Sequence, residues 1–306
     1  MPLNIIQPFQ LETSSYRGRL VQLDSVLNDI VTAHDYPAIL SQLLGETITL
    51  CSLLSSMLKY EGTFILQVQG DGPIKMVMAD MTSEGKIRAC ASYDAERLRT
   101  CSDQLEIFSK QACQDSYNKM AQLFGQGHIA FTVDQGDHTD RYQGIVELKG
   151  DSLIDCVQHY FCQSEQINTG IKIGVGMHEG KWKSTGIMLQ SLPEERFQGE
   201  DSLGYGNVQE DDWRRSMILL ESCTYEELLD PKIDPHNLLI RLFHEEGIRV
   251  FEPISVEKYC RCSQDKVESI LSSMSNDERD DLVVDGVIAM TCEFCNQNYV
   301  FSHKST

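Results

Sequence analysis

The sequence predicts an α+β protein with an N-terminal domain of antiparallel sheet plus helices, a short helical linker region, and a small C-terminal domain that binds zinc through four cysteines. Three observations support this. Residues 1–193 combine helical and strand-like hydrophobic periods, residues 194–254 open with an acidic stretch followed by short helical patterns, and residues 255–306 contain two closely spaced cysteine pairs. A chain of 306 residues is long enough for two or three such units.

The N-terminal domain begins with two helical patterns between Asp24 and Lys59. Apolar residues share one face before Pro37 and again after it, and proline is favoured in the first turn of a helix. These residues are Val26, Leu27, Ile30 and Val31 in the first run, and Ile39, Leu40, Leu43 and Leu44 in the second. We therefore expect two packed helices.

Strand-like runs follow in two sections. The first covers residues 64–68, 74–78 and 87–91, and the turn-forming segments between these runs predict an antiparallel meander. The second covers residues 129–133, 142–148, 171–175 and 186–189, with a helix at residues 152–164. Residues 1–193 should therefore fold as one α+β domain.

The linker region starts with a change in composition. Residues 194–212 hold seven acidic residues and one basic residue, which predicts a linker or a mobile insertion. Helical patterns follow at residues 213–222, at residues 225–229 behind a Thr224-x-x-Glu227 capping box, and at residues 235–246 behind Asp234. None is long enough to be stable alone, so we expect these helices to rest on the N-terminal domain.

The composition excludes several classes of function. With 26 basic and 46 acidic residues the formal charge is −20, which is the wrong sign for binding nucleic acid or an anionic membrane. The N-terminus lacks the features of a signal peptide, and no apolar run reaches the roughly 18 residues of a membrane span. Seven of the eleven cysteines are scattered through the first three quarters of the chain, unlike a secreted disulfide framework. These features predict a soluble protein of a reducing, cytoplasmic compartment.

The chemistry lies in two cysteine pairs, Cys260-x-Cys262 and Cys292-x-x-Cys295, separated by 29 residues. Four thiolates at this spacing are typical of one tetrahedral Zn²⁺. Between the pairs we expect a helix at residues 264–274, a Ser275-x-x-Glu278 capping box and a hairpin turning at Asp285-Gly286, with strands at residues 287–290 and 299–301. Because four cysteines leave no open coordination position, we do not expect an enzyme.

Oxidation offers a second role for the same thiolates, since a disulfide sulfur no longer holds the metal. In an extended chain the Cα atoms of Cys260 and Cys262 would be about 6.6 to 7.2 Å apart, near the limit of roughly 7 Å for a disulfide. A bridge between them would therefore need the backbone to turn. The site is then either an inert structural zinc or a redox switch, and both alternatives stay open on chemistry alone.

From about Phe9 to Phe301, the sequence closely resembles the heat-shock protein 33 family of redox-regulated holdase chaperones. The resemblance includes the two cysteine pairs, Cys292-Glu293-Phe294-Cys295-Asn296 and the closing Tyr299-Val300-Phe301. Further matching stretches are Arg17-Gly18-Arg19-Leu20-Val21, Gln69-Gly70-Asp71-Gly72-Pro73, Ser164-Glu165-Gln166, Leu189-Gln190-Ser191-Leu192-Pro193 and Leu242-Phe243-His244-Glu245-Glu246.

The resemblance implies a mechanism. In this family oxidants convert the four thiolates into two disulfides, zinc is released, an adjacent helical linker unfolds, and the protein binds unfolding clients without ATP. Carried over, Cys260 pairs with Cys262, Cys292 pairs with Cys295, and residues 213–257 form the linker. The resemblance also implies a homodimer in the oxidised form and transfer of clients to an ATP-dependent foldase system. Candidate client-contact residues are Met217, Leu219, Leu220, Leu238, Leu239, Leu242 and Phe243.

Two rival functions remain open. A zinc-ribbon adaptor would use the metal only to shape a docking surface. A zinc deaminase is loosely suggested by His244-x-Glu246 with Cys292-x-x-Cys295, but Thr291 replaces the expected proline and two cysteines would be left over. We expect His244 and Glu246 on a solvated helix end instead. The other cysteines are expected to be buried small apolar residues, with Cys223 in the linker as the candidate for side oxidation.

Overall fold

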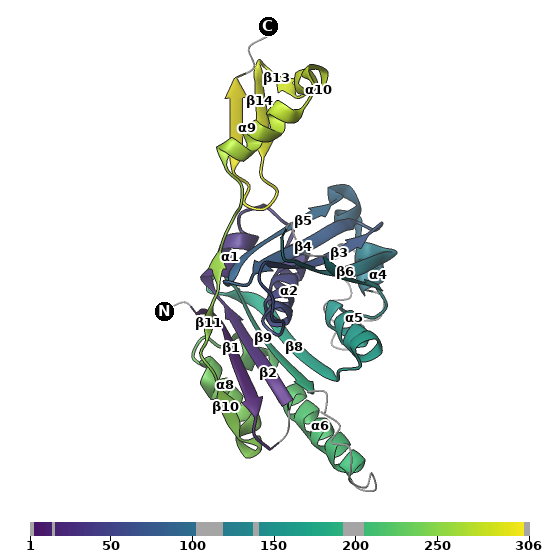
Figure 1. Cartoon of the computed structure of the whole chain (residues 1–306), viewed down its shortest axis with the longest axis vertical. Helices are drawn as coiled ribbons and strands as arrows, with labels where there is room; N and C mark the ends of the chain where they lie inside the picture. The colour runs from purple at the N-terminus through teal and green to yellow at the C-terminus, as the bar shows by residue number, and fades with distance from the viewer. Residues whose placement is uncertain (1–2, 14–15, 102–118, 137–140, 192–204, 303–306) are drawn as a thin grey trace.

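The computed structural model describes residues 3–13, 16–101, 119–136, 141–191 and 205–302. Figure 1 shows a body built on two sheets and a small C-terminal module that stands at one end of it. Within the described residues, the helix Ala38–Ser55 is long and apolar enough to cross a membrane, but 78% of it is buried inside the protein. It is therefore the core helix of the body.

The first sheet has the strand order β10-β1-β2-β9-β8, and β11 also pairs with β1. The strands are β1 Asn4–Leu11, β2 Tyr16–Leu23, β8 Thr169–His178, β9 Lys181–Ser191, β10 Ile248–Val250 and β11 Ile254–Ser255. The predicted runs at residues 171–175 and 186–189 are confirmed as parts of β8 and β9, but no strand was expected before Asp24. Pro8, a residue more typical of edges and turns than of a central strand, breaks up the pattern of β1.

The second sheet has the order β12-β5-β4-β3-β6-β7. Its strands are β3 Thr63–Gly70, β4 Ile74–Thr82, β5 Lys86–Tyr93, β6 Gly127–Asp134, β7 Tyr142–Glu147 and β12 Glu257–Lys258. The predicted meander is confirmed, because β3, β4 and β5 pair antiparallel in sequence. The short β12, from far along the chain, adds to β5 in parallel.

The main core lies between the two sheets and around α2 (Ala38–Ser55), as Figure 1 shows. The shorter α1 (Ser25–Val31) packs beside it, so both predicted helices are confirmed. The predicted helix at residues 152–164 is present as α5 (Leu153–Tyr160) continued by one π-helical turn, η1 (Phe161–Glu165), and its N-cap Ser152 accepts a hydrogen bond from the backbone N–H of Asp155. The helix α4 (Lys119–Phe124) completes the body.

Three helices and a 3-10 turn form the linker region: α6 (Tyr205–Ser222), α7 (Tyr225–Leu229), α8 (Pro235–Phe243) and η2 (His244–Glu246). The first linker helix was predicted to begin at residue 213, but α6 begins at Tyr205, inside the acidic stretch; residues 194–204 lie outside the described residues. Charge pairs one helical turn apart, Asp211 with Arg214 and Asp212 with Arg215, support a helix there. The capping boxes and N-caps predicted for α7 and α8 are confirmed.

The linker helices cover the outer face of the first sheet. A second buried cluster joins Phe9, Leu20 and Leu189 of the sheet to residues of all three helices, including Leu220, Leu228 and Phe243. Gly170 and Gly174 of β8 make room for this packing, because a Cβ atom at these positions would lie 2.3 Å from the sulfur of Met217 and 3.1 Å from the Cβ of Leu228. The expectation that the helices rest on the N-terminal part of the chain is confirmed.

The C-terminal module contains α9 (Gln264–Ser273), α10 (Asn276–Asp281) and a three-stranded sheet of β13 (Val283–Val284), β14 (Val287–Thr291) and β15 (Asn298–Ser302). The predicted capping box and hairpin are confirmed, and both Asp285 and Gly286 have the positive φ that a tight hairpin turn needs. The module buries Leu271 and Ile288 but leaves Ile270, Val284 and Val300 exposed. Its apolar core is thus small.

Candidate metal centre

Two local structures carry the cysteines. Cys260 and Cys262 lie between β12 and α9, on a segment without helix or strand that enters the module, whereas Cys292 and Cys295 lie in the turn between β14 and β15. In that turn the backbone N–H of Cys292 donates to Gln297 and the N–H of Asn296 donates to Cys292, each at 2.9 Å. Asn296 has a positive φ of 58°, which lets the chain reverse directly after the last cysteine.

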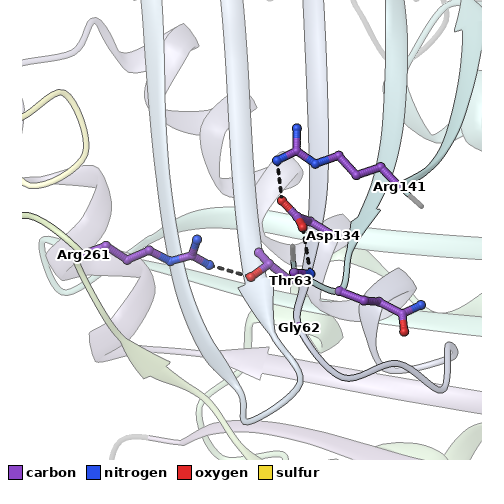
Figure 2. Close-up of a pocket in the computed structure, with 7 residues that line it drawn as sticks. Gly62, Thr63, Asp134, Arg141 and Arg261 are labelled. Atoms are coloured by element: carbon purple, nitrogen blue, oxygen red, sulfur yellow. Dashed lines mark hydrogen bonds and ion pairs between the residues drawn. The ribbon is translucent and has the colours of Figure 1, made fainter. Parts of the chain in front are cut away.

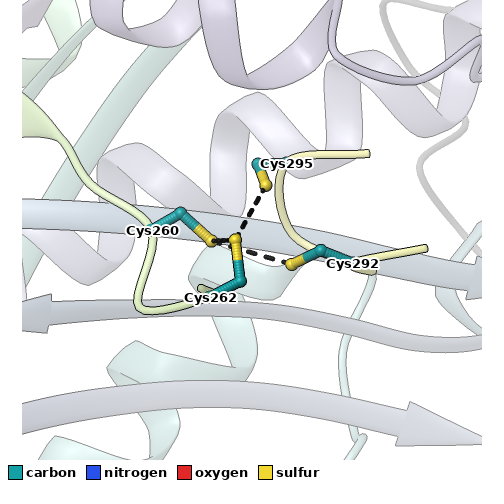
Figure 3. Close-up of side chains that lie close together, drawn as sticks. All are labelled: Cys260, Cys262, Cys292 and Cys295. Carbon is teal, nitrogen blue, oxygen red and sulfur yellow. Dashed lines mark hydrogen bonds between the residues drawn. The ribbon is translucent and has the colours of Figure 1, made fainter. Parts of the chain in front are cut away.

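The four sulfur atoms meet where the segment after β12 lies beside the turn between β14 and β15 (Figure 3). All four lie within 4.8 Å of one another. The Sγ of Cys260 is 3.2 Å from that of Cys262 and 3.7 Å from that of Cys292, and the Sγ of Cys262 is 3.4 Å from that of Cys295. Thiolates on a tetrahedral zinc, at about 2.3 Å from the metal, are about 3.8 Å apart. The donor set and its spacing therefore fit one Zn²⁺.

The surroundings affect the four thiols unequally. Burial acts to raise the pKa of Cys262, but hydrogen bonds from Tyr299 and the neighbouring thiols outweigh it and lower the pKa to about 7. Burial raises the pKa of Cys295 to about 12 and also raises that of Cys260. The Tyr299 hydroxyl lies 3.2 Å from the Cys262 sulfur. Among Cys260, Cys262 and Cys295, Cys262 is therefore the thiol that this environment deprotonates most readily.

The strand β12, which pairs with β5 of the body, lies just before the first cysteine in the chain. Glu257 and Lys258 pair with Lys86 and Ile87 of β5, and the N–H of Tyr259 donates to the carbonyl of Ile87 at 2.9 Å. This contact ends one residue before Cys260. The Lys258 ammonium also donates to the carbonyl of Asp29 at 2.8 Å.

Side chains next to the cysteines make further contacts with the body. Arg261 donates to the Thr63 hydroxyl at 2.6 Å, across the wall of a polar pocket that also contains Asp134 and Arg141 (Figure 2). The guanidinium of Arg88 lies 3.8 Å from the centre of the Phe294 ring. Asn296 donates to the carbonyl of Ala33 at 2.9 Å. Both cysteine pairs are thus held against the body.

A protein-family model described as Hsp33 protein matches residues 4–302. The chain belongs to the Hsp33 family. The 33 kDa chaperonin of Caulobacter vibrioides is 34% identical over 301 residues, which cover 97% of this chain and 94% of that protein. The 33 kDa chaperonin of Pseudomonas fluorescens is 35% identical over 297 residues, with 96% and 89% covered. The crystal structure of a 33 kDa chaperonin (heat shock protein 33 homolog) from Thermotoga maritima has the same fold, with a TM-score of 0.78 at 21% identity over 98% of this chain and 94% of the other.

In this Hsp33 chain the candidate client-contact residues are covered. Leu220, Leu238, Leu239, Leu242 and Phe243 are buried, and Met217 and Leu219 are partly buried against the same cluster. The ring of Phe243 stacks on that of Phe9, with 6.1 Å between their centres. Burying a large apolar side chain stabilises a fold by about 1.5 to 3 kcal/mol, so these contacts hold the linker down. While the linker is folded, five of the seven are therefore covered and the other two are only partly exposed.

One buried charge in the linker, that of Glu246, was not predicted from the sequence. Glu246, expected on a solvated helix end, is only 3% exposed, and it accepts hydrogen bonds from Arg215 of α6 and from the Thr13 hydroxyl. His244 is exposed as expected. Among the described side chains, the potential metal ligands that meet are the four cysteines, without His244. No sequence pattern indicates the burial of Glu246, because its partners Arg215 and Thr13 come from two other segments of the chain.

The remaining cysteines differ in burial. Cys51, Cys90, Cys156 and Cys223 are buried as expected, Cys101 is half-buried, Cys162 is exposed, and Cys113 lies outside the described residues. The expectation that Cys223 is prone to side oxidation is not supported for the folded linker, since burial raises the pKa of its thiol to about 11. The expectation that every extra cysteine is buried is wrong for Cys162.

Proposed function

We propose that this chain is a redox-regulated holdase chaperone whose four-cysteine site senses oxidants. The observation that carries the proposal is the position of the cysteine cluster, directly after a strand that pairs with the body and after linker helices that cover an apolar sheet face. Family membership over residues 4–302 and relatives named 33 kDa chaperonin support a chaperone rather than an enzyme. The three units, residues 1–193, 194–254 and 255–306, would bind clients, transmit the signal and sense it.

In the reduced protein, Cys260, Cys262, Cys292 and Cys295 would hold one Zn²⁺. Bound zinc would keep all four sulfurs as thiolates and supply roughly 10 to 16 kcal/mol toward folding of the small module. Two equivalents of peroxide would convert the thiols into two disulfides, Cys260 with Cys262 and Cys292 with Cys295, with each peroxide reduced to two waters. Disulfide sulfurs no longer coordinate the metal, so Zn²⁺ is released.

Loss of the module's fold would then remove support from the linker. The linker is joined to the module through β10, β11 and β12, which are short strands with few buried side chains. Once these strands separate, α6, α7 and α8 are held by the second apolar cluster alone. Unfolding of the linker exposes both its own seven apolar residues and the sheet face with Phe9 and Leu20, and either can bind an unfolding client without ATP.

The wider setting belongs to the same proposal. The oxidised form would act as a homodimer in the cytoplasm and pass its clients to an ATP-dependent foldase system. The net charge of −20 disfavours nucleic acid and anionic membranes as partners. A zinc-ribbon adaptor remains the contrasting function for the same site, because oxidation would abolish its docking surface rather than create a binding surface.

The test compares two forms of the full chain. Purified protein is kept reduced and zinc-loaded, or is treated with peroxide at mildly elevated temperature, and each form is added to an aggregating, heat-denatured enzyme. We expect the oxidised form alone to suppress light scattering by the client. A variant with all four cysteines replaced by serine controls for damage by peroxide elsewhere. Equal activity of the reduced form, or loss of activity on oxidation, would contradict the proposal.

A further inference from the structure

A buried carboxylate of the body lies beneath both cysteine pairs. Asp80 of β4 is 2% exposed. Its Oδ2 atom is 2.7 Å from Nε of Arg88, and its Oδ1 atom is 3.7 Å from a terminal nitrogen of Arg261. Arg88 belongs to the neighbouring strand β5, whereas Arg261 belongs to the C-terminal module. One buried charge of the second sheet therefore depends on a partner from the module.

Each cysteine pair contributes one residue to this arrangement. Arg261 is the residue between Cys260 and Cys262, and it also donates to Thr63 in the pocket wall of Figure 2. Phe294 lies between Cys292 and Cys295, and its ring lies over the guanidinium of Arg88 at 3.8 Å. We name Asp80, Arg88, Arg261 and Phe294 the docking cluster. It connects the two halves of the metal site through one carboxylate.

The chemistry of the cluster makes it sensitive to the conformation of the cysteines. Removing one partner from a buried charge is costly, because the remaining charge stays desolvated without full compensation. The position of Arg261 is fixed on both sides by metal-ligand residues. A disulfide between its two neighbours would draw their sulfur atoms, 3.2 Å apart in the docked site, into a covalent bond and would change the backbone on both sides of Arg261. The Arg261 guanidinium then loses the direction that brings it to Asp80 and Thr63.

We propose that Asp80 is a positioning residue of the redox switch: through Arg261 and Arg88 it holds both cysteine pairs in the docked, metal-binding geometry and sets how readily oxidants open the site. This inference rests on the proposed function and extends it to the N-terminal domain. When the docking cluster opens, β12 loses its anchor beside β5, so the change at the cysteines reaches the second sheet as well as the linker. Before oxidation, the docking cluster thus holds the thiolates in place. After oxidation, the opening of the cluster transmits the change at the cysteines to the second sheet.

The experiment uses the full, zinc-loaded chain with the variants Asp80→Asn, Arg261→Gln and their combination. Zinc release is followed with a coloured chelator at one fixed peroxide concentration, and hydrogen exchange of β12 is measured in the reduced protein. We expect each single variant to bind one zinc per chain before oxidation, to release it about fivefold faster than the parent, and to exchange faster at Glu257 and Lys258. The effects in the double variant should be less than additive, because both changes break the contact between Asp80 and Arg261.

Controls separate this role from a general loss of stability. Lys149→Gln removes one positive charge from an exposed ion pair with Glu147 and should behave as the parent does. Arg261→Lys keeps the positive charge and should release zinc more slowly than Arg261→Gln. This comparison tests the inference independently of whether Asp80→Asn folds. Unchanged zinc release in Arg261→Gln, additive effects in the double variant, or equally faster exchange throughout α2 would overturn the inference. Hydrogen exchange in the reduced form does not depend on chaperone activity. A failure of the proposed function would therefore be seen in the aggregation assay and not in the exchange measurement.

Discussion

Arg215 of α6 binds Glu246 of η2, with 2.6 Å between Nε and Oε1, and so ties the first and last helical segments of the linker to each other. The Thr13 hydroxyl, next to β1, also donates to Glu246. Because the carboxylate is buried, its partners cannot be replaced by water without opening the packing. The linker is therefore fixed to the first sheet by one charged contact in addition to its apolar cluster.

Replacing this carboxylate should loosen the linker without touching the metal site. We expect Glu246→Gln to lower the free energy of linker unfolding by about 1.5 to 3 kcal/mol, the range for hydrogen bonds to charged groups. The measurement is urea-induced loss of helical signal in the reduced, zinc-loaded protein. The neighbouring Glu245→Gln is the matched control, since the side chain of Glu245 is 82% exposed. Equal stability of the two variants would show that Glu246 does not fasten the linker.

Acid should weaken the same contact. The hydrogen bond from Arg215 outweighs burial and lowers the pKa of Glu246 below its ordinary value of 4.5 in the folded protein. The stabilisation is therefore complete above pH 4.5 and is lost as the pH falls through the lower folded value. The stability difference between the parent chain and Glu246→Gln should shrink over that acidic window. A difference that stays constant with pH would contradict this assignment.

The apolar part of linker docking can be tested at Phe243. Phe243→Ala removes a fully buried ring from its stack on Phe9, and substitutions of this kind cost about 3 to 5 kcal/mol. We expect the reduced variant to suppress client aggregation partially without peroxide, because its linker opens more often. Ile240→Ala on the same helix is the control, since Ile240 is 40% exposed. A reduced Phe243→Ala chain that is less stable but does not suppress aggregation would contradict this prediction, because opening the linker would then not be enough for client binding.

Removal of the metal under reducing conditions tests the role of zinc in folding. The module buries Leu271 and Ile288 but little else, so the chelated protein should lose amide protection in β14 and β15. The body should keep its protection in α2, which lies in the large core. Hydrogen exchange with and without chelator measures both regions at once. Persistent protection of β14 and β15 after the metal has gone would mean that the module folds without it.

The parts of the site predicted from sequence are those with local causes. The spacing of Cys260, Cys262, Cys292 and Cys295 and the hairpin turn at Asp285-Gly286 depend on neighbouring residues, and the cysteines meet as expected. The strands β10, β11 and β12 have two or three residues each, too few for a hydrophobic period, and they exist because distant strands offer open edges. Asp80 and Glu246 were missed for the same reason, since their partners come from segments far away in the chain.

The most direct test of the switch follows three signals on one sample during oxidation: zinc release, helical signal and suppression of client aggregation. We expect zinc to leave first or together with a loss of helix in the linker, and the suppression of aggregation to rise with that loss. The Cys260→Ser and Cys292→Ser variants, each lacking one of the two proposed disulfides, should not complete the response. Zinc that leaves a linker still folded, or activity that rises while zinc is retained, would contradict the account.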